Sequence, residues 1–222
     1  MENLGRFKNQ VAIVTGGATG LGKAAAKRLA AEGAQIVLRD IDENLLKEAA
    51  SDLTADGIVP ATHYCDVSIE SSVQKAFSFA HDQFERIDVM VNCAGIAGPT
   101  NVKIRDVSVE AFDQVQAVNL RGSFLTCREA IKYMEPANYG RILLIASIAG
   151  KEGNAGMMCY STSKAGRGCI FGRPKETCER ENTTSVWARV PSSARCTTSQ
   201  VARQSRSGCI GGRQSNSYMK MC

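Results

Sequence analysis

The sequence has neither a long apolar run nor an apolar segment near its start. None of its apolar runs approaches the roughly 18 residues that a membrane-spanning helix needs. The opening residues, Met-Glu-Asn-Leu-Gly-Arg-Phe-Lys, also lack the apolar centre of a secretory signal. We therefore expect a cytoplasmic protein with no membrane partner, in which the nine cysteines are reduced thiols.

Metal-binding spacings are also missing from the sequence. The chain has two histidines, His63 and His81, and both are isolated. The five cysteines after residue 166 include no Cys-x-x-Cys pair, which is a spacing typical of zinc sites. The sequence therefore predicts no bound metal.

Leucine is absent from the last 56 residues. Residues 1–166 contain 11 leucines and carry a net charge of −2, whereas residues 167–222 contain none and carry +7. Because leucine is a chief core-forming residue, a folded segment of that length without one is not expected. We therefore predict a folded domain over residues 1–166 and a basic segment over 167–222 that is disordered or poorly packed. One hypothesis for the abrupt change is translation of this segment in a shifted reading frame.

A basic segment can also bind nucleic acid through contacts with phosphate groups. Here Trp187 and Tyr218 are isolated, so aromatic residues do not alternate with the basic ones. We therefore do not expect a nucleic acid partner.

A strand, a glycine-rich turn and a helix follow one another near the start of the chain. Residues 11–14 are apolar and mostly β-branched, which predicts a buried strand, and the alanine-rich residues 23–31 predict a helix. Glycines between them let backbone N–H groups approach a ligand, and a helix N-terminus attracts phosphate. This arrangement favours a dinucleotide-binding turn over an ordinary glycine-rich turn. The candidate binding residues are Thr15, Gly16, Thr19, Gly20, Leu21 and Gly22.

Two charged residues end the second apolar strand, which begins at residue 35. Asp40 can accept hydrogen bonds from the ribose hydroxyls of NAD and would repel the 2′-phosphate of NADP, whereas Arg39 could pair with that phosphate. Because side chains alternate along a strand, only one of the two should face the ribose. We interpret Arg39 as a solvated charge and expect NAD(H) to be preferred, with NADP(H) as the alternative. Asp42 is predicted to cap the next helix.

Strand and helix patterns alternate along residues 1–166. This alternation predicts an α/β fold, a Rossmann-like doubly wound parallel sheet with strand order 3-2-1-4-5. The expected strands lie near 11–15, 35–39, 58–64, 88–92 and 140–146, and the expected helices near 21–32, 43–55, 69–84 and 109–134. No further strand is recognisable in residues 167–222, so the fifth strand is expected to be an uncovered edge of the sheet.

Tyr160 and Lys164 are four residues apart, so on a helix they share one face. A nearby ammonium favours the phenolate and lowers the pKa of tyrosine from its usual value of about 10. Tyrosine can then serve as a general acid or base. Taken alone, the pair is also compatible with a solvated lysine on a helix surface.

Several motifs, in the same order along residues 8–166, resemble the short-chain dehydrogenase/reductase family, including its 3-oxoacyl-carrier-protein-reductase-like members. The motifs are the glycine turn at 15–22, Cys65-Asp66-Val67, Asn92-Cys93-Ala94-Gly95, Val118-Asn119-Leu120, Ser147 after the fifth strand, and Tyr160 with Lys164. The resemblance implies a catalytic set of Asn119, Ser147, Tyr160 and Lys164. It implies coenzyme contacts from the glycine turn and from Asp40, Asp66, Val67, Asn92, Ala94, Gly95, Tyr160 and Lys164.

The resemblance also implies a reaction with a small-molecule alcohol or ketone. Tyr160 would exchange a proton with the substrate oxygen, Ser147 would hydrogen-bond that oxygen, and Lys164 would bind the nicotinamide ribose. Asn119 would position Lys164 through a water. We expect an NAD(H)-dependent oxidoreductase that interconverts a secondary alcohol and a carbonyl. The alternatives are an NADPH-dependent 3-oxoacyl-[acyl-carrier-protein] reductase and an inactive nucleotide-binding remnant.

The resemblance ends near Gly166. The helix that carries Tyr160 is expected to end early, because Gly168, Gly172 and Pro174 follow. The family's sixth strand, nicotinamide-contacting loop and substrate-covering segment are not recognisable, so we expect this chain to have little turnover. Family members often form homo-oligomers through two helices, of which this is one.

Overall fold

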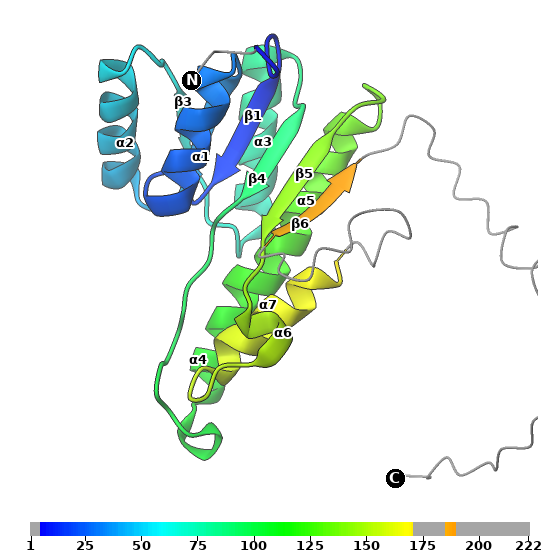
Figure 1. Ribbon diagram of the computed structural model, residues 1–222. Coiled ribbons are helices and arrows are strands. Elements are labelled where there is room, and N and C mark those ends of the chain that lie inside the picture. Colours follow the sequence, from blue (N-terminus) through cyan, green and yellow to red (C-terminus); the bar gives the residue numbers. More distant parts are fainter. Residues whose placement is uncertain (1–4, 171–184, 190–222) are drawn as a thin grey trace, which may run out of the picture. The chain divides into compact units, whose positions relative to one another are not determined.

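Five parallel strands and one antiparallel strand make up the sheet of the computed structural model, which describes residues 5–170 and 185–189 (Figure 1). The strands are β1 Val11–Thr15, β2 Gln35–Asp40, β3 Ala61–Tyr64, β4 Val89–Asn92, β5 Arg141–Ile145 and β6 Ser185–Arg189. They lie in the order β3-β2-β1-β4-β5-β6. The predicted α/β fold and the predicted order of the first five strands are confirmed.

The register aligns the carboxyl ends of the parallel strands. Thr15 at the end of β1 lies opposite Arg39 of β2 and Asn92 of β4, and Asn92 lies opposite Leu144 of β5. Segments that leave these strands therefore begin at one edge of the sheet, which is where ligands bind in folds of this type.

The helices match the predicted ranges closely. They are α1 Gly20–Ala31, α2 Glu43–Ala55, α3 Glu70–Phe84, α4 Val109–Gln116, α5 Gly122–Met134, α6 Ala149–Glu152 and α7 Met158–Gly168, with short turns η1 Ile104–Asp106 and η2 Ala117–Arg121. The side chain of Asp42 accepts hydrogen bonds from the backbone N–H groups of Asn44 and Leu45, which confirms the predicted cap of α2. Within the described ranges, no helix combines the length and apolar character of a membrane span.

Alternate residues of β1 pack into two separate cores. Val11 and Ile13 join a cluster that includes residues of α3 and α5. Ala12 and Val14 join a second cluster that includes residues of α1 and α2. The sheet is therefore covered by helices on both faces, as a doubly wound fold requires.

One wide helical turn interrupts the helix predicted over residues 109–134. Residues 117–121 form a π-helical turn, η2, between α4 and α5. Such turns add a residue to the helical repeat and often occur at functional sites. Asn119, one of the predicted catalytic residues, lies in this turn and is fully buried.

Strand β6 corrects the expectation that the fifth strand is an uncovered edge. It runs antiparallel to β5, with Arg189 opposite Arg141 and Ser185 opposite Ile145. Such pairing is made by backbone hydrogen bonds, so a strand of five residues without a leucine can form it. The composition of residues 167–222 therefore did not indicate this strand.

The early end predicted for the Tyr160 helix is confirmed, because α7 ends at Gly168. After it, Ile170 packs against the cluster that contains Val11 and Ile13. The rest of the predicted poorly packed segment, apart from β6, lies outside the described residues. The predicted division of the chain into a folded domain over residues 1–166 and a poorly packed segment over 167–222 stays a prediction.

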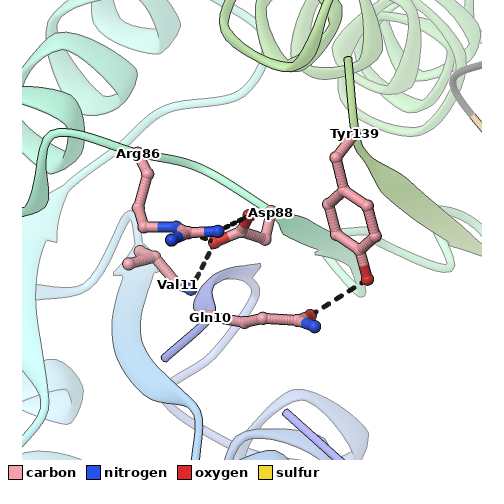
Figure 2. Close-up of polar contacts among 5 residues, drawn as sticks. All are labelled: Gln10, Val11, Arg86, Asp88 and Tyr139. Atoms are coloured by element: carbon pink, nitrogen blue, oxygen red, sulfur yellow. Dashed lines mark hydrogen bonds and ion pairs between the residues drawn. The ribbon is translucent and has the colours of Figure 1, made fainter. Parts of the chain in front are cut away.

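A buried carboxylate joins β1 to β4 at the amino ends of the strands. Asp88 accepts a hydrogen bond of 2.8 Å from the backbone N–H of Val11 and two more of 2.8 Å from the guanidinium of Arg86 (Figure 2). Nearby, the hydroxyl of Tyr139 donates to the side-chain oxygen of Gln10. The Asp88 side chain is only 2% exposed, so these bonds stabilise the fold at the edge opposite the glycine-rich turn.

We expect Asp88→Ala to lower the free energy of unfolding by about 2–4 kcal/mol, because it leaves the buried N–H of Val11 without its acceptor and removes an ion pair whose carboxylate is buried. Denaturant unfolding of both proteins measures the change. Lys27→Ala is the matched control, since Lys27 pairs with Asp56 at a solvent-exposed position, and such pairs contribute at most about 1 kcal/mol. Equal losses in the two variants would contradict a structural role for Asp88.

Candidate coenzyme-binding and active site

A cleft of about 510 Å³ lies at the carboxyl ends of the parallel strands. Ten of the predicted coenzyme residues line it: Gly16, Thr19, Gly20, Leu21, Gly22, Asp40, Asp66, Val67, Ala94 and Gly95. The other four, Thr15, Asn92, Tyr160 and Lys164, are not among its lining residues. The structure therefore brings most of the predicted set together from four different strand ends.

Glycine is required at one point of the turn after β1 and at one point in the first turn of α1. Gly16 has a φ of 63°, and a Cβ atom there would lie 2.7 Å from the backbone nitrogen of Ala94. A Cβ atom at Gly22 would lie 2.0 Å from the carbonyl oxygen of Gly16. Only glycines allow the turn, the start of α1 and the segment after β4 to approach this closely.

The amino end of α1 is open towards the cleft. Thr19, the residue before the helix, makes no capping hydrogen bond with its side chain. The first N–H groups of a helix have no partner within it, and the helix dipole adds partial positive charge there. The residues of the turn therefore fit the pyrophosphate of a dinucleotide coenzyme.

Asp40 borders the cleft where β2 ends. Its carboxylate accepts hydrogen bonds from the backbone N–H groups of Ala18, at 3.2 Å, and Ile41, at 2.8 Å. These bonds fix the carboxylate beside the glycine turn. An acid at this position suits the ribose hydroxyls of an adenosine and disfavours a 2′-phosphate.

Arg39 corrects our interpretation of this residue as a solvated charge. Its side chain is fully buried, its Nη2 donates to the carbonyl oxygen of Ala76 at 2.7 Å, and its guanidinium lies 5.0 Å from the centre of the Phe79 ring. The physical reason is the alternation of side chains along β2: Asp40 faces the cleft, so Arg39 faces α3. Burial lowers the pKa of Arg39 to about 10.

Asn92 and Thr15 are the last residues of β4 and β1, and each directly precedes a residue that lines the cleft. Asn92 is buried, and its amide donates to the hydroxyl of Thr126 at 2.6 Å. The hydroxyl of Thr15 is also buried and has no hydrogen-bond partner within the described residues. Asp66 does line the cleft, and its carboxylate accepts from the backbone and hydroxyl of Ser68.

Asn119 and Lys164 converge beside Gly95. The amide of Asn119 exchanges two hydrogen bonds with the backbone of Ile96, at 2.8 and 2.9 Å, and donates a third to the hydroxyl of Ser163. A Cβ atom at Gly95 would lie 3.1 Å from the side-chain oxygen of Asn119 and 3.8 Å from Nζ of Lys164. The wide turn η2 thus directs Asn119 at the segment that lines the cleft.

Tyr160 and Lys164 share one face of α7, as their spacing predicts. Nζ of Lys164 lies 5.5 Å from the centre of the Tyr160 ring and donates to the carbonyl oxygen of Ile145 at 2.8 Å. The Lys164 residue is 6% exposed. Burial, together with the charge of Arg167, lowers the pKa of Lys164 to about 8.

Ser147 lies between β5 and α6, at the same edge of the sheet. It is half-buried, and its hydroxyl oxygen accepts a hydrogen bond of 3.2 Å from the backbone N–H of Ala149. The four predicted catalytic residues thus come from η2, the end of β5 and α7. All three segments adjoin the carboxyl ends of β4 and β5.

Residues 10–172 match the family model of short chain dehydrogenases. The chain belongs to this family. It is 36% identical over 159 residues to (+)-borneol dehydrogenase 2 of Salvia officinalis, which covers 72% of this chain and 56% of that protein. It is 39% identical over 162 residues to 2-dehydro-3-deoxy-L-rhamnonate dehydrogenase (NAD(+)) of Sphingomonas sp. (strain SKA58), covering 73% and 63%.

A crystal structure of NAD+-bound xylitol dehydrogenase is similar in fold. It has 32% sequence identity and a TM-score of 0.72, and the match covers 74% of this chain and 63% of that one. The chain therefore spans less than two thirds of the length of the curated relatives (+)-borneol dehydrogenase 2 and 2-dehydro-3-deoxy-L-rhamnonate dehydrogenase (NAD(+)). The predicted family and fold are confirmed.

Several residues that line the cleft were not predicted from the sequence as site residues. They are Ile41, Cys65, Cys93, Ile96, Gln114 and Val118. Gln114 and Val118 are four residues apart on α4 and η2, just before Asn119, so the helical repeat could have indicated a shared face. Ile41 directly follows Asp40 and could have been inferred from that neighbour.

Arg167 was also not predicted to lie near the site. Composition predicted that it begins the poorly packed segment, but its side chain is fully buried. It donates to the carbonyl oxygens of Ile145, Asn92 and Ala94, and to the side-chain oxygen of Asn92. Burial lowers the pKa of Arg167 to about 10. No sequence pattern pointed to this residue, because arginine is rarely buried without an acidic partner.

Proposed function

We propose that this chain binds NAD(H) in the cleft and interconverts a secondary alcohol and a carbonyl on a small molecule. The convergence of Asn119 and Lys164 on Gly95, which lines the cleft, carries the proposal. Because Lys164 and Tyr160 both lie on α7, this convergence places α7 next to the cleft that we propose binds the dinucleotide. Two relatives are named as dehydrogenases, and the name of one of them includes NAD(+); both names support the proposed function.

The choice of NAD(H) over NADP(H) follows from the end of β2. The Asp40 carboxylate lines the cleft, whereas the Arg39 guanidinium is buried against α3 and cannot reach a 2′-phosphate there. Thr19, before the second glycine of the turn, adds no positive charge. The NADPH-dependent 3-oxoacyl-[acyl-carrier-protein] reductase is the less favoured alternative for these reasons.

The coenzyme, when bound, supplies or accepts the hydride. The glycine turn and the start of α1 would hold its pyrophosphate, and Asp40 its adenosine ribose. Tyr160 would give a proton to the substrate oxygen during reduction and take it back during oxidation. Ser147 would donate a hydrogen bond to the same oxygen, and charged Lys164 would favour the phenolate form of Tyr160. Asn119 would position Lys164 through a water.

Binding of the nucleotide without turnover is a second candidate. Ser147, Tyr160 and Lys164 do not line the cleft in this structure, and productive hydride transfer requires close and aligned reactants. An assay of the purified 222-residue chain with NADH and a panel of ketones separates the two candidates. Turnover supports the oxidoreductase, whereas NADH binding without any turnover would support the remnant.

Asp40→Ser tests the coenzyme assignment. We expect the dissociation constant of NADH to rise by about 10- to 100-fold, because hydrogen bonds to a charged acceptor are worth about 1.5–3 kcal/mol, and the preference for NADH over NADPH to disappear. Isothermal titration calorimetry measures both constants. Asp42→Ser is the matched control, since serine retains the cap of α2. Tighter binding of NADPH than of NADH by the unmodified chain would refute the assignment.

A further inference from the structure

Two cationic side chains share one acceptor at the end of β5. Nζ of Lys164 and Nη1 of Arg167 both donate to the carbonyl oxygen of Ile145, at 2.8 and 2.9 Å. The two residues are three positions apart on α7 and therefore lie on the same face. Bonding to one atom holds the ammonium and the guanidinium next to each other.

Among the residues that the structure describes, no acidic side chain pairs with the guanidinium of Arg167. Its four acceptors, three carbonyl oxygens and the amide oxygen of Asn92, are all uncharged. Its Nε has no hydrogen-bond partner within the described residues. A fully buried, uncompensated positive charge acts strongly on its neighbours because little water screens it.

The other titratable groups near the pair do not offset this charge at neutral pH. Cys93 after β4 and Cys127 on α5 act on Arg167, and Cys93 also acts on Lys164. Burial raises the pKa of the Cys93 thiol to about 11 and that of Cys127 to about 12, so both are uncharged. Tyr160 lies on α7 itself. The elements packed against α7 carry their charged side chains at exposed positions, namely Lys151 and Glu152 on α6, Glu110 and Asp113 on α4, and Arg121 on η2.

We infer that Arg167 is a positioning residue that fixes Lys164 beside the Tyr160 ring and limits the pH range in which Lys164 stays charged. This inference rests on the proposed function, because that function needs a charged Lys164. The pKa of Lys164, about 8, means that the ammonium is present below this pH and is lost as pH rises through it. Turnover should therefore decline above about pH 8.

Arg167→Gln tests the inference, because glutamine can still donate to the carbonyl oxygens but carries no charge. We expect the titration midpoint of Lys164 to rise by about one pH unit and the alkaline limit of turnover to move with it. Arg167→Lys restores a positive charge and should return the midpoint towards that of the unmodified chain. Arg167→Met supplies a second neutral variant if glutamine disturbs folding.

NMR of the full chain with 13C-labelled lysine measures the midpoint directly, with Lys164→Arg assigning the signal. Arg141→Gln is the matched control. Arg141 lies at the start of β5, at the opposite end of the strand from Ile145, which accepts the hydrogen bonds of Lys164 and Arg167. The titration does not require turnover. If the titration midpoint of Lys164 shifts as expected but no turnover is detected, only the proposed function is weakened. An unchanged midpoint in both neutral variants, with NADH binding intact, would overturn the role of Arg167.

Discussion

Tyr160→Phe is expected to lower the rate of carbonyl reduction by about 10²- to 10⁴-fold, the usual contribution of a positioned general acid. The ring and its packing on α7 remain, so only the exchangeable proton is lost. The unmodified rate is itself expected to be low, so single-turnover measurements at high protein concentration are the appropriate assay.

The dissociation constant of NADH separates chemistry from folding in this experiment. We expect it to change by less than about threefold in Tyr160→Phe, because the proposed contacts with the dinucleotide come mainly from the glycine turn and Asp40. Tyr139→Phe is the matched control, since Tyr139 donates its hydroxyl to Gln10 at the other edge of the sheet. If Tyr160→Phe reduced the carbonyl at the full rate of the unmodified chain, Tyr160 could not be the general acid.

Gly22→Ala is expected to abolish tight coenzyme binding. The added Cβ atom would lie 2.0 Å from the carbonyl oxygen of Gly16 and 2.7 Å from its carbonyl carbon, so the backbone of the turn must shift. Several hydrogen bonds to the pyrophosphate would be lost together, which corresponds to a rise of at least about 100-fold in the dissociation constant of NADH. Overpacking should also cost about 1–3 kcal/mol of folding free energy.

Gly57→Ala provides the comparison for this substitution. Gly57 has a φ of 80°, but nothing lies within 4 Å of an added Cβ atom. We therefore expect a modest loss of stability from backbone strain and an unchanged affinity for NADH. Normal NADH affinity in Gly22→Ala would contradict the close approach seen between the turn and α1.

The strands, the glycine turn and most lining residues were predictable because each depends on local patterns. Buried parallel strands are continuous apolar runs, and Gly16 and Gly22 stand where the backbone allows no side chain. The register of parallel strands then brings Asp40 and Gly95 to one edge. Chain order and these patterns together were enough to identify the cleft.

The features that were missed depend on contacts between distant segments. Arg39 is buried because α3 covers its side of β2, and β6 exists because β5 offers an unpaired edge. Arg167 is buried because carbonyl oxygens from the ends of β4 and β5 converge on it. None of these partners is near in sequence, so no local pattern indicates them.

The hypothesis of a shifted reading frame concerns residues 167–222, most of which lie outside the described residues. Resequencing the coding region around codon 166 tests it, and an uninterrupted frame shared by independent isolates would refute it. The expectation that the early end of α7 disturbs the homo-oligomer common in the family likewise stays a prediction.

The central claim is that the cleft binds the coenzyme. Isothermal titration calorimetry of NADH into the purified 222-residue chain tests this claim most directly. We predict saturable binding at one site per chain, weaker binding of NADPH, and loss of binding in Gly22→Ala. The absence of any saturable heat with millimolar NADH, from protein shown to be folded by circular dichroism, would contradict the assignment of the cleft to the coenzyme.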